Sequence, residues 1–295
     1  MTIGAIIKRA GAELADAGIS ESGNDAVKLC EHVFGISREQ LYAHPEFEPD
    51  EKDVQKFFEL VERRKKREPL AYVTGVAFFY GHKFKVTPDV LIPRWDTEII
   101  VSVAQELISE FEEKTKGRAE VLDLCCGSGC VGISLAAQTK ALVTCSDIST
   151  PAVAIAKENA GRIIKDEKMR IRFAVSDLFR KITGKFDFIV SNPPYVKKDE
   201  IRTLMPEVAE FEPFGALCGG DDGLKFYRLI AAQAPDFLNP GGRLLLEIGC
   251  DQARDVSRLL RESGFKSIKI TKDLAGRDRV ITAGYRRVTE EEENV

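Results

Sequence analysis

The hydrophobic positions of residues 1–75 follow the helical period. Three amphipathic faces are formed by Ile3, Ile6, Ile7, Ala10 and Leu14, by Val27, Cys30, Val33 and Phe34, and by Val54, Phe57, Phe58 and Val61. Capping-box spacing at Ser22 with Asp25 and at Ser37 with Gln40 marks two helix starts. The last helix is expected over residues 49–67, before a proline. No glycine-rich loop or acid–base cluster accompanies these helices, so the segment is interpreted as a bundle that packs or recognises a partner.

The pattern changes at residue 76. Aromatic and β-branched residues, with Gly81 and Pro88 as turn residues, predict a β-hairpin over residues 76–95. From residue 96, apolar runs alternate with amphipathic segments. The expected strands are Val121–Cys125, Leu142–Asp147, Ile171–Ser176, Phe186–Asn192, Arg243–Gly249, Ser267–Thr271 and Arg279–Tyr285. The expected helices are Thr97–Glu113, Cys130–Gln138, Pro151–Ile164, Leu224–Ala234 and Gln252–Ser263.

This alternation predicts an α/β fold with a seven-stranded, mostly parallel, Rossmann-like sheet that helices cover on both faces. The expected organisation is a helical domain over residues 1–75, a hairpin linker over 76–95 and a catalytic domain over 96–287. Residues 288–295, with an acidic run at 290–293, are expected to form a disordered tail.

Composition and charge exclude several classes of protein. The chain has 295 residues, of which 44% are hydrophobic, and a net charge of -4. Neither residues 1–75 nor the remainder has an excess of basic side chains, so no direct nucleic-acid partner is expected. The basic run at 63–67 is interpreted as a solvated helix end. No apolar run approaches the roughly 20 residues that span a bilayer, so no membrane is expected. The seven cysteines and the lack of a secretory signal predict reduced thiols in a cytoplasmic protein.

Ligands of a parallel sheet bind outside the carboxyl ends of its strands. The first strand is followed by residues 125–130, in which Gly127 and Gly129 allow a ligand to approach the backbone closely. The second strand ends at Asp147, whose carboxylate can accept both hydroxyls of a ribose. Gly132 completes the spacing of a dinucleotide-binding turn, which leaves a dinucleotide as an alternative ligand.

The fourth strand runs into Asn192-Pro193-Pro194-Tyr195. The two prolines stop the strand and stiffen the turn, so Asn192 is expected at the strand tip beside the ligand crevice. The Asn192 side-chain oxygen and the Pro193 carbonyl can together hold both hydrogens of a planar NH2 group. They would favour the charge that develops as a methyl group arrives. Tyr195 offers an aromatic wall for a planar substrate group. The place of this motif, after the glycine turn and the acid, favours function over an ordinary Asn-Pro-Pro turn.

Together these motifs resemble those of the class I S-adenosylmethionine-dependent methyltransferases that act on planar NH2 groups. Within that class the chain looks like the release-factor glutamine methyltransferases of the PrmC or HemK type. The similarity extends over nearly the whole chain. It includes Arg67–Gly75, Leu91–Arg94 with Thr97 and Glu98, Ser176–Phe179, Glu212 and Pro213 with Ala216 and Leu217, Gly219–Leu224, Glu247–Gly249 and Lys272–Arg279. A helical amino-terminal domain also suits this family, where it helps to dock the protein substrate.

The resemblance implies a protein-glutamine N-methyltransferase with S-adenosylmethionine as methyl donor and S-adenosylhomocysteine as product. Its implied substrate is the glutamine in the Gly-Gly-Gln loop of class I peptide chain release factors, which are the expected partners. The residues implied to bind the cofactor are Cys125, Cys126, Gly127, Ser128 and Gly129 at its methionine part, Asp147 at its ribose, Asp177 and Leu178 at its adenine, and Asn192. The residues implied to hold the substrate glutamine are Asn192, Pro193, Pro194 and Tyr195.

The chain departs from the family pattern at two positions. Cys125 replaces the first glycine of the turn, and Trp95 replaces a proline, where it is expected to alter the wall near the methyl donor. The thiols of Cys125, Cys126 and Cys130 lack a second pair at ligand spacing, so no metal is expected. Three alternatives stay open: a ribosomal-protein glutamine methyltransferase, a nucleic-acid adenine amino methyltransferase that flips its base, and a non-catalytic binding module.

Overall fold

The computed structural model describes residues 1–164 and 170–285, so the expected acidic tail at 288–295 lies outside the described residues. The chain divides into two compact units. Unit 1 comprises Met1–Val76 and Met205–Phe211, and unit 2 comprises Ala77–Leu204 and the residues from Glu212 onward. The segment 205–211 lies inside the stretch expected for the catalytic domain, yet it folds with the helices of unit 1.

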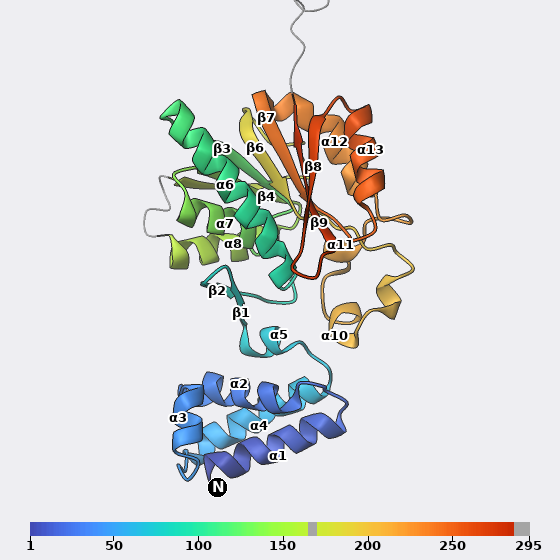
Figure 1. The fold of residues 1–295 in the computed structure, drawn as a ribbon. Helices are drawn as coiled ribbons and strands as arrows, with labels where there is room; N and C mark the ends of the chain where they lie inside the picture. Colours follow the sequence, from blue (N-terminus) through green and yellow to red (C-terminus); the bar gives the residue numbers. More distant parts are fainter. Residues whose placement is uncertain (165–169, 286–295) are drawn as a thin grey trace, which may run out of the picture. The chain divides into compact units, whose positions relative to one another are not determined.

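Unit 1 consists of helices (Figure 1), and its buried apolar residues form one cluster. Its helices are α1 (Ile3–Asp16), α2 (Ser22–Phe34), α3 (Arg38–Ala43), α4 (Glu51–Lys65), α5 (Leu70–Thr74) and α10 (Pro206–Ala209). The apolar faces predicted from the sequence meet in this core, where Ile6, Leu14 and Phe57 are fully buried. The capping box of Ser37 with Gln40 is formed.

The capping box predicted for Ser22 with Asp25 is not formed, so that prediction was wrong. α2 begins at Ser22 itself, and Glu21, at the N-cap position, makes no side-chain cap. The Asp25 carboxylate instead accepts a hydrogen bond of 2.8 Å from Nε of Arg64. Both side chains are buried, and a buried guanidinium without a counter-charge would cost more than a missing helix cap.

The basic run at 63–67 is ion-paired, which corrects its interpretation as a solvated helix end. Arg64 is only 7% exposed, and its Nη1 donates to Oε1 of Glu207 at 3.0 Å. Nη2 of Arg67 donates to Oε2 of the same carboxylate at 2.7 Å. Two further members of the run pair with acidic side chains of unit 1. Most of this positive charge is therefore balanced within the unit, and Glu207 joins the segment 205–211 to α4.

Unit 2 contains the seven-stranded sheet that the sequence predicts (Figure 1). Its strands are β3 (Glu120–Leu124), β4 (Leu142–Asp147), β5 (Ile171–Val175), β6 (Phe186–Ser191), β7 (Leu238–Glu247), β8 (Lys266–Lys272) and β9 (Asp278–Gly284). They lie in the order β5-β4-β3-β6-β7-β9-β8. The strands from β5 to β7 are parallel, and β9 runs antiparallel to both its neighbours. The fold class is confirmed.

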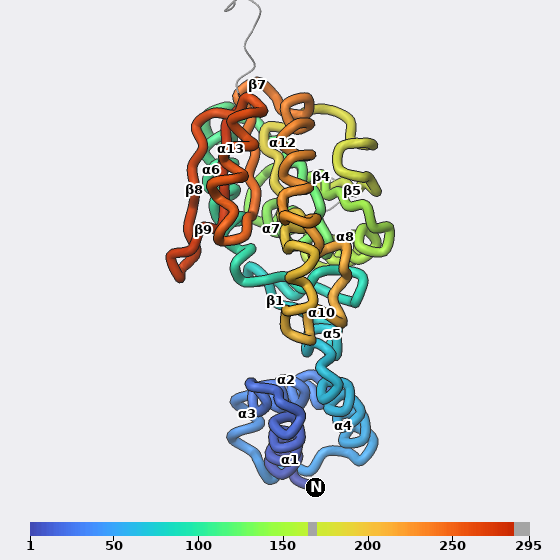
Figure 2. The backbone as a smooth tube through the Cα atoms, turned by 90° about the vertical axis from the view of Figure 1, so that its right-hand side faces the viewer, coloured from blue at the N-terminus to red at the C-terminus, as the bar shows by residue number. Residues whose placement is uncertain are grey.

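Helices cover both faces of this sheet, as the ribbon and tube views show (Figures 1 and 2). They are α6 (Glu98–Thr115), α7 (Cys130–Gln138) and α8 (Thr150–Ile163) on one face and α12 (Lys225–Phe237) and α13 (Ala253–Glu262) on the other. Short helical turns occur at η1 (Trp95–Thr97), η2 (Ile201–Thr203) and α11 (Phe214–Leu217). Val121 of β3 faces the first group of helices, and its neighbour Leu122 faces the second. Because both faces are buried, the strands are nearly continuous apolar runs in the sequence.

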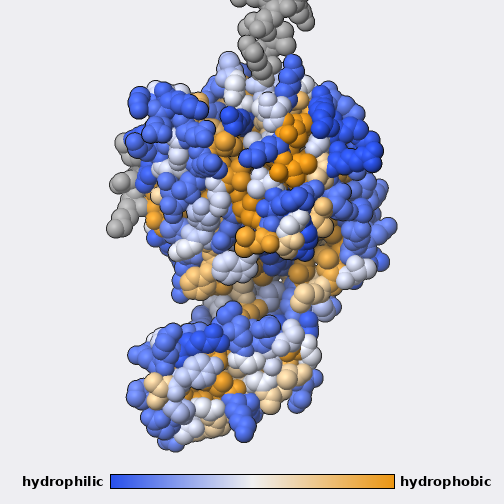
Figure 3. All heavy atoms as spheres, in the orientation of Figure 1, coloured by the Kyte–Doolittle hydropathy of each residue, from blue (hydrophilic) through white to orange (hydrophobic). Residues whose placement is uncertain are grey.

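The predicted hairpin is formed by β1 (Val76–Phe79) and β2 (His82–Lys85). Its Phe79 and Phe84 are buried in the cluster beneath α6, α7 and α8. In the view of Figure 3, hydrophilic residues dominate the surface of unit 2, and hydrophobic residues gather in a band over the strands beside α6. Of the helices in the described part of the chain, none is long and apolar enough to cross a membrane.

Candidate active site

The segments that follow β3, β4 and β6 meet at one edge of the sheet. Leu124, the last residue of β3, pairs with Ser146 of β4 and with Ser191 of β6. Oγ of Ser191 also donates to the Leu124 carbonyl at 2.8 Å. The parallel register therefore places the glycine turn, Asp147 and Asn192 next to one another, where parallel sheets bind their ligands.

The turn after β3 contains three residues with a left-handed backbone. The φ angles are +59° at Cys125, +52° at Gly127 and +80° at Gly129. Glycine adopts this conformation without steric cost, whereas a residue with a Cβ atom is strained there. At Gly129 a Cβ atom would also lie only 2.7 Å from Cδ1 of Ile133. Cys125 therefore adopts a strained backbone conformation, at a position where the family that the chain resembles has glycine.

The third glycine of the dinucleotide spacing, Gly132, is explained by packing. A Cβ atom on it would lie 2.5 Å from Sγ of Cys145 and 2.8 Å from Oδ2 of Asp123. Its N–H donates to that carboxylate oxygen at 2.8 Å. Asp123 is buried, which raises its pKa to about 7. The close approach of α7 to β3 and β4 thus accounts for Gly132 without a dinucleotide.

The carboxylate of Asp147 is fixed in place by the backbone. Oδ2 accepts a hydrogen bond from the N–H of Gly127 at 2.9 Å, and Oδ1 accepts one from the N–H of Ser149 at 2.9 Å. Burial raises the pKa of Asp147, and these two hydrogen bonds oppose that rise. Each carboxylate oxygen retains a free lone pair, so the group can still accept hydrogen bonds from a ligand.

A cavity of about 410 Å³ opens at this edge of the sheet. The site residues expected from the sequence that line it are Cys125, Gly127, Asp147, Asp177, Leu178, Asn192 and Pro194. Cys126 and Ser128 line a smaller adjoining hollow of about 40 Å³. Gly129, Pro193 and Tyr195 line neither. The larger volume lies within the range of roughly 300–1,000 Å³ that is typical of small-molecule sites.

The amide of Asn192 is anchored on one side. Its Nδ2 donates to Oγ1 of Thr97 at 3.1 Å, and Thr97 is buried at the end of η1. Oδ1 makes no hydrogen bond to any residue that the structure describes. Asn192 itself lines both hollows, so an acceptor oxygen is available at the cavity.

Tyr195 turns into the core and not toward the cavity. Its ring packs against the apolar cluster beneath α12 and α13. The carboxylate of Glu247, at the end of β7, is buried, and its burial raises its pKa to about 7. Burial also raises the pKa of Tyr195 itself. In this position the side chain supports the Asn-Pro-Pro-Tyr corner (residues 192–195) from inside.

The backbone of the corner is held by Gln252 and by a glycine-rich loop, residues 219–224. Nε2 of Gln252 donates to the Tyr195 carbonyl at 3.1 Å and to the Gly223 carbonyl at 3.3 Å. A Cβ atom on Gly219 would come within 2.8 Å of the Tyr195 Cα, and one on Gly223 within 2.5 Å of the Tyr195 carbonyl oxygen. The glycines of this loop are therefore needed for its close contact with the corner.

Two loops that line the cavity, residues 89–94 and 212–216, are tied together by Glu212. This carboxylate accepts from the N–H of Ile92 at 3.3 Å and forms an ion pair with Arg94. Glu212 is 5% exposed, and its burial raises its pKa. The neighbouring Trp95 is 75% exposed and lines neither hollow.

Sequence reasoning gave no site role to Thr97, Gln252 or Asn159. Asn159 is fully buried in α8, and its Nδ2 donates at 3.0 Å to the Ser128 carbonyl and to the Lys85 carbonyl. It therefore ties the glycine turn to β2. The signal in the sequence is a single polar residue on the inward face of an apolar helix. This pattern predicts a buried amide that is hydrogen-bonded, but it does not identify the hydrogen-bond partners.

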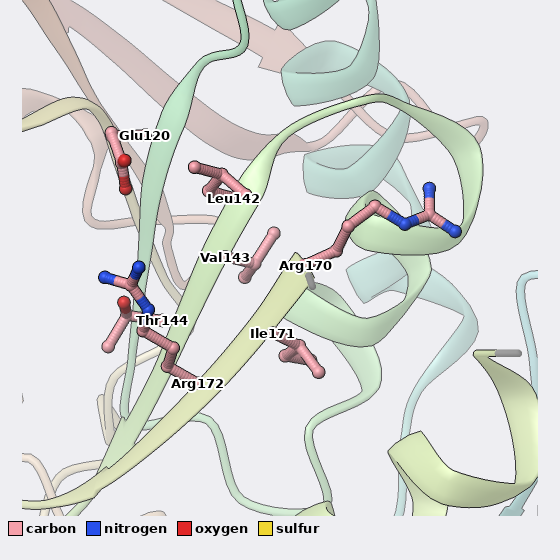
Figure 4. A pocket seen from close by; sticks show the side chains of 7 residues that line it. All are labelled: Glu120, Leu142, Val143, Thr144, Arg170, Ile171 and Arg172. Atoms are coloured by element: carbon pink, nitrogen blue, oxygen red, sulfur yellow. The ribbon is translucent and has the colours of Figure 1, made fainter. Parts of the chain in front are cut away.

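A separate small hollow, of about 40 Å³, lies at the other end of the strands (Figure 4). It is lined by Glu120, Leu142, Val143, Thr144, Arg170, Ile171 and Arg172. Arg172 extends toward Thr144, whereas Arg170 extends the other way (Figure 4). None of the expected site residues lines it. Across residues 1–164 and 170–285, no group of three or more His, Cys, Asp or Glu side chains is placed to hold a metal ion.

Comparison with known proteins identifies relatives over both units. Residues 5–75 match the PrmC N-terminal domain, and residues 100–209 match the methyltransferase small domain. A release factor glutamine methyltransferase of Clostridium botulinum is 41% identical over 275 residues, which cover 92% of this chain and 94% of the relative. One of Clostridium acetobutylicum is 40% identical over 263 residues, covering 88% of this chain and 90% of the relative.

A solved structure shares the fold. The T. Thermophilus 16S rRNA methyltransferase in complex with AdoMet and guanosine matches with a TM-score of 0.50. The match covers 72% of this chain and 50% of the other, at 20% sequence identity. At this identity the likeness concerns the fold alone.

Proposed function

Because the chain belongs to the family of release factor glutamine methyltransferases, we propose that it methylates a release factor with S-adenosylmethionine as the methyl donor. The acceptor is the side-chain amide nitrogen of the glutamine in the Gly-Gly-Gln loop of a class I peptide chain release factor. The protein is thus a protein-glutamine N-methyltransferase, and its second product is S-adenosylhomocysteine.

The observation that carries the proposal is the free oxygen of Asn192 at the cavity. A carboxamide nitrogen is a poor nucleophile because its lone pair is delocalised. Oδ1 of Asn192 lies at the cavity, whereas Pro193, the next residue, is buried and lines neither hollow. The proposal uses this oxygen and the Pro193 carbonyl as the two acceptors that hold both hydrogens and direct the nitrogen. As the nitrogen–carbon bond forms and the carbon–sulfur bond breaks, positive charge develops on the nitrogen, and the two acceptors favour it. The proton leaves the nitrogen after the transfer.

The cavity fits the methyl donor in size and in chemistry. When bound, S-adenosylmethionine supplies an electrophilic methyl group on a sulfonium. Asp147 lines the cavity with free lone pairs, which suits the ribose hydroxyls. The residues proposed to contact the methionine part are Cys125, Cys126, Gly127, Ser128 and Gly129, and those proposed to contact the adenine are Asp177 and Leu178. Gly129 acts through the shape of the turn, since it lines neither hollow.

Two further assignments belong to the same proposal. Unit 1 docks the release factor, which suits its match to the PrmC N-terminal domain. Much of its basic run is paired within the unit, which leaves less positive charge for nucleic acid. The reaction takes place in the cytoplasm, and nucleic acid is not a substrate. The roles of Pro194 and Tyr195 are to stiffen and support the corner that holds the substrate glutamine.

The test is transfer of labelled methyl groups to a panel of class I release factors, ribosomal proteins and DNA. Label is expected in a release factor and is lost when its loop glutamine is replaced. Asn192→Ala is expected to reduce transfer at least about 100-fold, the scale for one preorganised polar group. Asn239→Ala, which removes an amide elsewhere in unit 2, serves as the matched control. Label in a ribosomal protein or DNA, with none in release factors, would refute the proposal.

A further inference from the structure

The side-chain amide of Gln252 is buried between three segments at the ligand-binding edge of the sheet. Gln252 is 6% exposed and directly precedes α13. Its Nε2 donates to the Tyr195 carbonyl at 3.1 Å and to the Gly223 carbonyl at 3.3 Å, and its Oε1 accepts from the Gly249 N–H at 2.9 Å. One side chain therefore joins the Asn-Pro-Pro-Tyr corner, the glycine-rich loop and the segment that follows β7.

The partners of this amide determine which way it faces. A backbone carbonyl can only accept a hydrogen bond, so the carbonyls of Tyr195 and Gly223 select its NH2 group. A backbone N–H can only donate, so Gly249 selects its oxygen. Turned by half a rotation, the amide would place oxygen against oxygen and N–H against N–H. The Gln252 amide is therefore held in one orientation.

The Tyr195 carbonyl depends on Gln252 for its hydrogen bond. The next residue, Val196, is held by the backbone: its N–H donates to the Leu217 carbonyl at 2.9 Å, and its carbonyl accepts from the Gly219 N–H at 2.8 Å. In the part of the chain that the structure describes, no backbone N–H donates to the Tyr195 carbonyl. The hydrogen bond from Nε2 of Gln252 therefore fixes the direction of this carbonyl.

A displacement at Tyr195 reaches Asn192 through few free torsions. The two residues are separated by two prolines, whose rings lock φ. Asn192 directly follows β6, and Ser191 at the end of β6 is hydrogen-bonded to β3. The corner is therefore a short, stiff connection that is fixed at one end by the sheet and at the other by Gln252.

We infer that Gln252 is a positioning residue for the methyl transfer: its amide fixes the Tyr195 carbonyl and, through the stiff corner, the direction in which Asn192 meets the substrate amide. The inference rests on the proposed function, since it concerns the same site. Gln252 lines neither of the two hollows that Asn192 lines, so it acts without touching substrate or cofactor. Its contribution is geometric, and a displacement of about 1 Å at a reacting group can reduce a rate about 100-fold.

The test uses Gln252→Met, which keeps the length of the side chain but has no N–H and no carbonyl oxygen. The kcat for methyl transfer is expected to fall roughly 10- to 100-fold. The KM for the release factor and the affinity for S-adenosylmethionine are expected to change less than about threefold, because other residues hold Asp147 in place. Gln233→Met is the matched control and should stay within about twofold of the wild type, since Nε2 of Gln233 donates to the Leu229 carbonyl of its own helix.

Loss of folded protein would also lower the apparent kcat, so the active sites are counted. Calorimetric titration with S-adenosylmethionine gives the number of binding sites per chain, and kcat is expressed per site. A purely structural role predicts fewer sites with an unchanged kcat per site, whereas positioning predicts a full number of sites with a reduced kcat per site. If Gln252→Met does not fold, Gln252→Asn, whose amide is too short to span its three partners, is expected to lower kcat per site about 3- to 10-fold.

A second readout does not depend on activity. Tyrosine precedes valine at two places in the chain, residues 72–73 and 195–196. In protein labelled with ¹³C at the tyrosine carbonyl and ¹⁵N at valine, these two pairs alone give carbonyl–amide correlations, and Tyr195→Phe identifies the second pair by its loss. Gln252→Met is expected to move the Tyr195 carbonyl signal to lower frequency, as the loss of a hydrogen bond does, and to leave the Tyr72 signal unchanged.

The outcomes separate this inference from the proposed function. A wild-type protein that methylates no release factor refutes the proposed function, while the carbonyl signal still tests whether Gln252 fixes the corner. In an active protein, an unchanged kcat per site in the folded variant overturns the inference. An unchanged Tyr195 signal overturns it as well, and so does an equal loss of kcat in Gln233→Met.

Discussion

The Cα atom of Tyr195 lies only 2.8 Å from the position that a Cβ atom on Gly219 would occupy. The Pro194 carbonyl oxygen lies 2.9 Å from the same position. Contacts this short are to backbone atoms, which cannot rotate away as a flexible side chain can. The position of the Asn-Pro-Pro-Tyr corner is therefore set partly by the absence of a side chain at residue 219.

Gly219→Ala is accordingly expected to displace the corner. We expect a loss of methyl transfer of at least tenfold and a decrease in the free energy of unfolding of about 1–3 kcal/mol, the scale of overpacking. Activity assays and urea denaturation measure the two effects. Gly117→Ala is the control, because its Cβ atom would meet only the Thr115 hydroxyl at an ordinary 3.5 Å. A Gly219→Ala protein with wild-type activity and stability would contradict this account, because the loop at 219–224 would then not fix the position of residues 192–195.

Cys125→Gly is expected to relieve backbone strain in the glycine turn. A left-handed residue with a Cβ atom is disfavoured by about 1 kcal/mol or more, and glycine is not. Because glycine also makes the unfolded chain more flexible, the net gain in the free energy of unfolding is expected to be at most about 1 kcal/mol. Cys126→Gly is the matched comparison: Cys126 is buried without a positive φ angle, so the same change there should destabilise. Denaturation curves in which both variants lose stability equally would contradict this account.

Asp147→Ala is expected to weaken S-adenosylmethionine binding by roughly 1–3 kcal/mol, the scale of a lost charge-assisted hydrogen bond. The variant also leaves the N–H groups of Gly127 and Ser149 without their acceptor. Calorimetric titration measures the affinity. Asp89→Asn, at an exposed residue that lines the same cavity, should change it by less than about threefold. Equal affinities for wild type and Asp147→Ala would place the ribose elsewhere.

Stability is expected to fall as the pH rises from about 4.5 to 7. Burial raises the pKa of Glu247 from 4.5 to about 7 and that of Asp123 from 3.8 to about 7. In this window the folded protein keeps protons that the unfolded chain has lost, so the free energy of unfolding decreases with pH and levels above 7.

Glu247→Gln should remove its share of this decrease, up to about 3 kcal/mol by the conversion of pKa into free energy. Urea denaturation between pH 5 and 8 measures the slope, and Glu106→Gln, on the exposed side of α6, controls for the loss of a carboxyl group. Parallel pH curves for Glu247→Gln and the wild type would contradict the assignment.

The strands and their ligand-binding edge could be predicted because the relevant signals are local. Leu142–Asp147 is a short, largely apolar run that ends in an acid, and Gly127 and Gly129 of the turn are separated by a single residue. Alternation of strands with helices then dictates a parallel sheet whose carboxyl ends converge. The fold could therefore be predicted without knowing which residues distant in the sequence are in contact.

The supports of the site could not be predicted because they join residues that are far apart in the sequence. Thr97 and Asn192 are 95 positions apart, and Gln252 and Tyr195 are 57 apart. No periodicity records such a pairing. The sequence also does not determine the direction of the Tyr195 side chain. A tyrosine at a strand end can either line the cavity or pack in the core. Only packing against α12 and α13 decides between them.

The pairing of Glu207 with Arg64 and Arg67 has a practical consequence for dissecting the protein. A fragment that stops at residue 76 would retain Arg64 and Arg67 but would lose Glu207, whose carboxylate pairs with both of them. The helices of residues 1–76 form one compact unit with a segment that begins some 130 residues later in the chain. During translation Arg67 is therefore made well before the carboxylate of Glu207, which lies 140 positions further along the chain.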